Sequence, residues 1–176
     1  EMCIRDRKHA NEDFINSNLI VFGGEQKNIN EIKDFYIEQT KCNCKSYVET
    51  DLVTASLIKY TINSFLATKV SFFNELNKIF VRVNANDSWD NFISYIQKDS
   101  RLGDSHMSVP GHDGKKGFGG ACLPKDSIAL LNFYKENDLD FKVLKSVIDV
   151  NNIIRDKYND DPREREQRIN FKKSIT

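Results

Sequence analysis

Residues 57–76 read LIKYTINSFLATKVSFFNEL and lie inside a longer stretch, residues 51–83, that contains neither glycine nor proline. Apolar side chains recur here at intervals of three and four residues, the spacing of one face of an α-helix. Thr50 or Asp51 can cap its beginning. We therefore predict one continuous helix, about 50 Å long at 1.5 Å per residue, as the central element. Its apolar positions are Leu52, Ala55, Ile58, Ile62, Phe65, Leu66, Phe73, Leu76, Ile79 and Phe80.

The segment before this helix has the pattern of a small α/β unit. Residues 19–22, followed by two glycines, predict a short buried strand; residues 30–39 predict a helix, and residues 46–49 a second strand. Strand, helix, strand is the order of a crossover in a parallel sheet. The expected fold class is therefore mainly α, with a small α/β remnant.

The segment after the long helix predicts three further helices. The first begins at Asp87 or Ser88 and runs through Ile96, the second covers residues 124–137, and the third residues 140–156. Residues 160–166 are almost all charged, and we expect them to be solvated or frayed.

Composition excludes several classes of function. The 176 residues carry 26 basic and 26 acidic side chains, so the balanced charge does not favour nucleic acid or an anionic membrane as partner. No apolar run reaches the roughly 18 residues that span a bilayer, and we expect a cytoplasmic protein. Cys42 and Cys44 lack the spacing and second pair of a zinc site, and with only three histidines we expect no metal.

A second informative stretch, residues 117–126, reads GFGGACLPKD. Its three glycines allow sharp turns and close approach of a ligand. Pro124 suits the first position of a helix, which would place Cys122 just before a helix N-terminus, where the helix dipole favours a thiolate. Asp126 follows four residues later, close enough to serve as a base or to orient a water molecule.

Both stretches resemble the UDP-glucose/GDP-mannose dehydrogenase family. Residues 117–126 match every position of the family's cysteine loop, G-[FY]-G-G-x-C-[FL]-x-K-D, and residues 57–76 resemble its central helix, with Lys59 and Asn63 at matching positions. The similarity covers most of residues 8–155. It implies NAD-dependent oxidation of a sugar-nucleotide alcohol to a carboxylate, as in polysaccharide biosynthesis, through a cysteine-bound thiohemiacetal and thioester.

The resemblance also implies roles for individual residues. Arg101 matches an arginine that reaches the substrate of the neighbouring subunit, and Lys125 matches a lysine near the cofactor. The expected catalytic residues are Cys122, Lys59, Asn63 and Asp126; the expected substrate-binding residues are Lys59, Asn63, Arg101 and Gly119; the expected NAD-binding residues are Cys122 and Lys125.

The resemblance divides the chain into four parts. Residues 1–7 match nothing, residues 8–49 correspond to the end of a Rossmann-like NAD-binding domain, residues 50–155 to a central helical domain that forms a homodimer, and residues 156–176 to a charged tail leading to a further domain. The chain contains no G-x-G-x-x-G fingerprint, and we expect it to bind NAD weakly by itself. Residues 104–116 form an inserted loop.

Three other functions remain open. The Arg-Leu-Gly and Cys-Leu-Pro-Lys-Asp contexts favour conversion of UDP-glucose to UDP-glucuronate, but oxidation of GDP-mannose shares most of these residues. A dimerisation fragment without activity of its own is a second alternative. A free-standing cysteine hydrolase ranks last, because Cys122 has no convincing histidine partner in the sequence.

Overall fold

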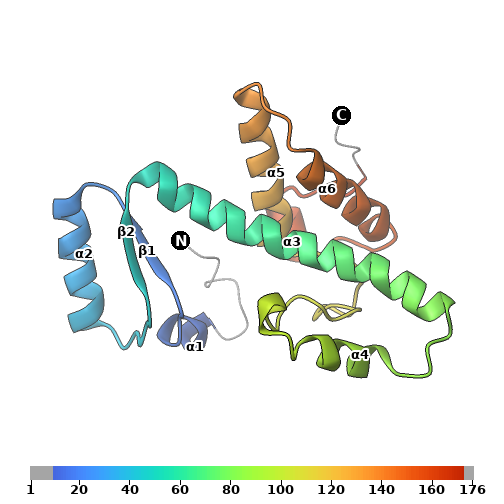
Figure 1. Ribbon diagram of the computed structural model, residues 1–176. Helices are drawn as coiled ribbons and strands as arrows, with labels where there is room; N and C mark the ends of the chain where they lie inside the picture. Colours follow the sequence, from blue (N-terminus) through green and yellow to red (C-terminus); the bar gives the residue numbers. More distant parts are fainter. Residues whose placement is uncertain (1–9, 173–176) are drawn as a thin grey trace. The chain divides into compact units, whose positions relative to one another are not determined.

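The computed structural model describes residues 10–172 (Figure 1). The chain divides into two compact units, the first ending at Thr61 and the second beginning at Ile62. Helix α3 (Leu52–Arg82) passes from one unit into the other as a single helix of 31 residues. The predicted long helix is therefore confirmed. Asp51 caps it, because its Oδ1 accepts hydrogen bonds from the backbone N–H groups of Val53 and Thr54 at 2.8 and 3.0 Å.

The first unit contains the predicted strand–helix–strand arrangement. Its elements are α1 (Ala10–Ile15), β1 (Ile20–Gly23), α2 (Gln26–Gln39) and β2 (Tyr47–Thr50), followed by the first residues of α3. The two strands pair in parallel, with Ile20 opposite Tyr47, and α2 supplies the crossover that parallel strands require. Phe22 and Ile29 form its buried centre. The small α/β remnant is thus confirmed.

The second unit is helical. After α3 come α4 (Trp89–Ile96), a 3₁₀ helix (Ser100–Leu102), α5 (Cys122–Glu136), α6 (Lys142–Arg155) and α7 (Pro162–Glu166). Figure 1 shows α5 and α6 on one side of α3 and α4 on the other. The apolar core is divided accordingly: one cluster contains Ala67, Phe118 and Val147, and the other contains Phe73, Ile93 and Met107.

Two local expectations are corrected. Helix α5 begins at Cys122, so this residue lies within the first turn rather than before it, and Pro124 is the third helical residue. Pro124 is still tolerated because the first N–H groups of a helix have no intrahelical acceptor. The tail is not uniformly solvated either. Asp161 and Glu164 form a capping box around α7, and Glu164 is 1% exposed.

Candidate active site

Four of the predicted site residues come together around the first turn of α5. Cys122 is half-buried, and Asp126 lies one helical turn further on with no exposed surface. Asn63, on α3, donates its side-chain N–H to Oδ2 of Asp126 at 2.6 Å. The ammonium group of Lys125 pairs with Oδ1 of Asp126, also at 2.6 Å. Both oxygens of this buried carboxylate are therefore satisfied, as burial of a charge requires.

The glycine loop, residues 117–121, is held in place by side chains that accept hydrogen bonds from its backbone N–H groups. The N–H of Gly117 donates to Oδ1 of Asn74 at 3.0 Å, and the N–H of Phe118 donates to Oδ1 of Asn151 at 2.6 Å. Asn151 also donates its Nδ2 to the carbonyl of Phe118 at 2.9 Å. Both asparagines are buried. These amides from α3 and α6 replace the regular backbone pairing that a loop lacks.

Two of the glycines meet a steric requirement. Gly117 has a φ of +75°, a backbone conformation that residues with a side chain rarely adopt. At Gly119 the constraint is space, because an added Cβ would collide with the guanidinium of Arg155 and the carboxylate of Glu164. The loop backbone is thus pressed directly against charged groups from α6 and α7.

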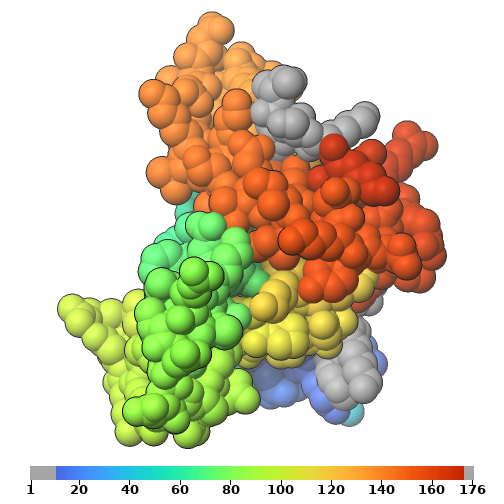
Figure 2. Space-filling view, turned by 90° about the vertical axis from the view of Figure 1, so that its right-hand side faces the viewer, coloured from blue at the N-terminus to red at the C-terminus, as the bar shows by residue number. Residues whose placement is uncertain are grey.

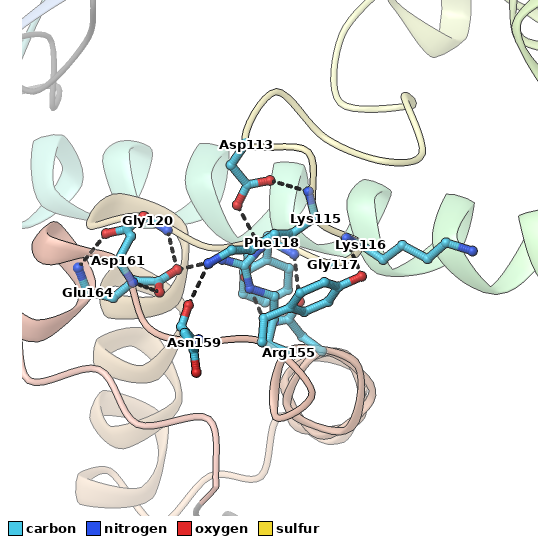
Figure 3. A network of polar contacts seen from close by, with 12 residues as sticks. Asp113, Lys115, Lys116, Gly117, Phe118, Gly120, Arg155, Asn159, Asp161 and Glu164 are labelled. Carbon is cyan, nitrogen blue, oxygen red and sulfur yellow. Dashed lines mark hydrogen bonds and ion pairs between the residues drawn. The ribbon is translucent and has the colours of Figure 1, made fainter.

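Arg155 occupies the centre of this region (Figure 3). Its side chain is 1% exposed; Nη2 pairs with Oε1 of Glu164 at 2.6 Å and Nη1 with Oδ2 of Asp113 at 2.7 Å. The guanidinium also lies 5.8 Å from the ring centre of Tyr158 and 5.5 Å from that of Phe171. Burial tends to raise the pKa of Asp113, but hydrogen bonds from Arg155 and the Lys115 backbone, together with the positive charges of Arg155 and Lys115, outweigh it and lower that pKa below its ordinary value.

The inserted loop, residues 104–116, contacts the same group of residues around Arg155. In Figure 2 its yellow surface lies between the green C-terminal part of α3 and the orange-red C-terminal helices. Besides the Asp113–Arg155 contact, Lys115 donates its Nζ to the carbonyl of Asn159 at 2.6 Å. The insertion therefore packs against the segment that supports the glycine loop.

Arg101 and Lys59 are the other predicted side chains of the site. Arg101, in the 3₁₀ helix, has a side chain that is 86% exposed and forms an ion pair with Asp99. Lys69 holds this turn by donating its Nζ to the carbonyl of Leu102 at 2.9 Å. Lys59 is half-buried on α3, one turn before Asn63, and belongs to the first compact unit. The roles of Lys59 and Arg101 therefore stay predictions.

The residues that support the glycine loop were not predicted from the sequence, although two signals point to them. Asn74, Asn151 and Arg155 occupy helix positions that otherwise carry apolar side chains, and a polar residue on an apolar face needs a partner. The stretch Asp161-Pro162-Arg163-Glu164 has the pattern of a capping box with proline at the first helical position. Because most residues of this stretch are charged, the burial of Glu164 was not expected.

No cluster of three metal-binding side chains occurs among residues 10–172. In the same part of the chain, no helix has both the length and the apolar character needed to cross a membrane.

Comparison with known proteins identifies the family. The model of the UDP-glucose/GDP-mannose dehydrogenase family, central domain, matches residues 53–153. The chain belongs to this family. The match includes the helix that carries Asn63 and the loop and helix that carry Cys122 and Asp126, whereas Arg155 and Glu164 lie just beyond it.

Individual relatives agree with this assignment. The UDP-glucose 6-dehydrogenase of Rickettsia bellii is 40% identical over 141 residues, which are 80% of this chain and 31% of that protein. A UDP-glucose 6-dehydrogenase of Bacillus subtilis is 40% identical over 105 residues, 59% of this chain and 22% of that protein. Among solved structures, a UDP-glucose dehydrogenase from Pyrobaculum islandicum superimposes with a TM-score of 0.70 at 30% identity, covering 82% of this chain and 31% of that one. The chain thus spans less than a third of the length of each of these relatives.

Proposed function

We propose that this chain is the central part of an NAD-dependent UDP-glucose 6-dehydrogenase, which oxidises UDP-glucose to UDP-glucuronate. One observation carries the proposal: the 2.6 Å hydrogen bond from Asn63 to Asp126, one turn beyond Cys122. It joins two stretches of sequence, 63 residues apart, that separately resemble the family. An amide, a buried carboxylate and a thiol then lie around one helix terminus, which is the set of groups that oxidation through a thioester needs.

Cys122 is the proposed nucleophile. Its Sγ adds to the carbonyl carbon of the aldehyde that the first oxidation produces, and the carbonyl oxygen gains a proton to give a thiohemiacetal. Loss of hydride from that carbon to the nicotinamide acceptor, together with loss of the hydroxyl proton, gives a thioester. Addition of water then breaks the carbon–sulfur bond, releasing the carboxylate and returning the thiol.

The proposed roles of Asn63, Lys59 and Asp126 are charge stabilisation and proton transfer. The amide of Asn63 has two N–H donors, and the hydrogen bond to Asp126 uses one of them. The other, together with the ammonium of Lys59, can stabilise negative charge on the substrate oxygen as sulfur adds. A carboxylate has about four lone-pair positions, so Asp126 can still accept a proton from the hydrolytic water while holding Asn63 and Lys125.

The cofactor and substrate contacts complete the proposal. When bound, NAD would supply the hydride acceptor for each oxidation. Cys122 and Lys125 fit a position beside it, because both project from the first turn of α5, where the N–H groups have no side-chain cap and the dipole favours an anionic group. Gly119 would contact the sugar nucleotide through its backbone. The exposed guanidinium of Arg101 would reach the substrate of a neighbouring subunit.

A homodimer through the central helices is part of the proposal. Phe65, Phe72 and Ile79 are 63, 61 and 51% exposed on α3. They are spaced seven residues apart, which places them on one stripe of the helix. An exposed apolar stripe of this kind marks a protein interface, and a second copy of the same stripe is self-complementary across a two-fold axis.

The substrate assay tests the proposal. The complete enzyme is incubated with NAD and either UDP-glucose or GDP-mannose, and NADH and sugar acid are both measured. We expect two NADH for each UDP-glucuronate and slow or no reaction of GDP-mannose. A preference for GDP-mannose would contradict the proposed substrate. One NADH per product, or release of an aldehyde, would contradict the two-step mechanism. The 176-residue chain alone, assayed in parallel, is expected to be inactive.

A further inference from the structure

The buried ion pair between Glu164 and Arg155 has no part in the mechanism proposed above, although it touches the glycine loop. We propose that Glu164 is a positioning residue for Cys122 and that Arg155 orients Glu164. The proposal rests on the nucleophilic role of Cys122 given under the proposed function. It assigns to α7 the task of fixing the backbone from which Cys122 projects.

The contacts of Glu164 converge on the loop. Oε1 accepts the backbone N–H of Gly120 at 2.9 Å and Nη2 of Arg155 at 2.6 Å. Oε2 accepts the backbone N–H of Asp161 at 2.8 Å, which closes the capping box of α7. One buried carboxylate therefore links the glycine loop, α6 and the start of α7. Figure 3 shows these groups around the Arg155 guanidinium.

Arg155 fixes the direction of this carboxylate. Its second donor, Nη1, is engaged by Asp113 at 2.7 Å in the inserted loop, and the aromatic rings of Tyr158 and Phe171 lie close to its guanidinium. A planar guanidinium with separate N–H groups can bridge two carboxylates at fixed angles, whereas a lysine ammonium on a flexible chain cannot. Arg155 thus joins α6 to Asp113 directly and to Gly120 through Glu164.

The position of Gly120 explains why this contact affects Cys122. Only Ala121 separates Gly120 from Cys122, the first residue of α5. Gly120 has a φ of +74°, and as a glycine it has access to much more backbone space than other residues. The hydrogen bond to Glu164 selects one backbone direction at this flexible point. Because misplacement of a reacting group by about 1 Å can cost about a hundredfold in rate, the direction chosen here determines how Sγ meets the substrate.

Stability alone does not account for the pair. Buried ion pairs often contribute no more to stability than apolar side chains of the same volume would. The same pair is well suited to set a direction, since each of its hydrogen bonds has a defined geometry.

The test compares three variants of the 176-residue chain. Glu164→Ala removes the acceptor for Gly120. Glu164→Gln keeps an acceptor oxygen, Oε1, for the N–H of Gly120 and so retains the loop contact. It also places the Nε2 donor against the N–H donor of Asp161, which weakens the cap of α7. Glu166→Ala removes the same charge from an exposed position on the same helix and serves as the matched control. Amide hydrogen exchange of Gly120 is measured by NMR, and alkylation of Cys122 by iodoacetamide is measured by peptide mass spectrometry.

We expect Glu164→Ala to accelerate exchange at Gly120 by about tenfold or more and to change the alkylation rate of Cys122 by about fivefold or more. Glu164→Gln should restore Gly120 protection at least in part, and Glu166→Ala should match the wild type. Cys42, in the other unit, is the internal control for reagent. Unchanged Gly120 exchange, unchanged Cys122 alkylation, or equal acceleration at Leu130 and Leu131 in α5 would each overturn the positioning role.

Neither measurement depends on turnover. If the complete enzyme fails to oxidise UDP-glucose while Glu164→Ala still alters Gly120 and Cys122, the proposed function fails and the link between Glu164 and the loop stands. If the enzyme is active, Glu164→Ala should lower kcat by about tenfold or more and change KM by less than about twofold. An unchanged kcat would overturn the positioning role while leaving the proposed function intact.

Discussion

Asp126 connects the predicted site residues of α3 and α5. It is fully buried, yet it has a partner for each oxygen, the amide of Asn63 and the ammonium of Lys125. The sequence predicted Asn63 and Asp126 as members of one site, and the structure adds that their side chains touch. The sequence did not predict the hydrogen bond itself, because α3 and α5 come together only through the packing of the second unit.

Gly119 gives the first prediction at this scale. Gly119→Ala should lower the free energy of unfolding by about 1–3 kcal/mol, the usual cost of forcing extra volume into a packed site, because the new Cβ would collide with Arg155 and Glu164. Gly111→Ala is the matched control, since a Cβ there would meet only ordinary contacts at 3.5 Å. Urea unfolding of both variants checks this, and equal stability of the two would contradict the close approach at Gly119.

At the scale of elements, the sequence predicted regular structure better than irregular structure. The long helix, the parallel strands and helices α4, α5 and α6 follow from periodicity and capping residues, which act locally. The sequence predicts a frayed tail where α7 forms, because local charge does not reveal the buried contact between Glu164 and Arg155. The supports of the glycine loop were missed for the same reason, since Asn74 and Asn151 are distant from it in sequence.

The contact between the inserted loop and α6 predicts a dependence of stability on pH. The pKa of Asp113 is lowered in the folded chain, so its ionised form contributes stability that is fully present above the unfolded pKa of about 3.9. That contribution is lost as the pH falls through the lower folded pKa. Wild type should therefore be more stable than Asp113→Asn at pH 5–7, and the difference should shrink below about pH 4.

Urea unfolding of both proteins between pH 3 and pH 7 measures that difference. Asp140→Asn, which alters an exposed carboxylate, is the control and should show little difference at any pH. A wild-type advantage that grows as the pH falls would contradict the ion pair between Asp113 and Arg155.

At the scale of the whole molecule, the apolar stripe on α3 needs a partner surface. We predict that the complete protein is a homodimer and that Phe72→Glu weakens the dimer by at least about a hundredfold, because two charges would be buried at a two-fold interface. Phe133→Glu is the control, since Phe133 is 48% exposed on α5 and lies outside the stripe. Analytical ultracentrifugation checks both. A wild-type monomer at micromolar concentration, or a Phe72→Glu dimer as strong as the wild type, would contradict this assembly.

The nucleophilic role of Cys122 is the central claim, and steady-state production of UDP-glucuronate by a Cys122→Ser variant of the complete enzyme tests it most directly. Serine is a much weaker nucleophile than a thiolate at neutral pH, so we predict that UDP-glucuronate formation falls by about a thousandfold or more, with an aldehyde-level species accumulating on the enzyme. Cys42→Ser, which alters a cysteine of the first unit, should leave the rate unchanged. Near-normal production of UDP-glucuronate by Cys122→Ser would contradict the account.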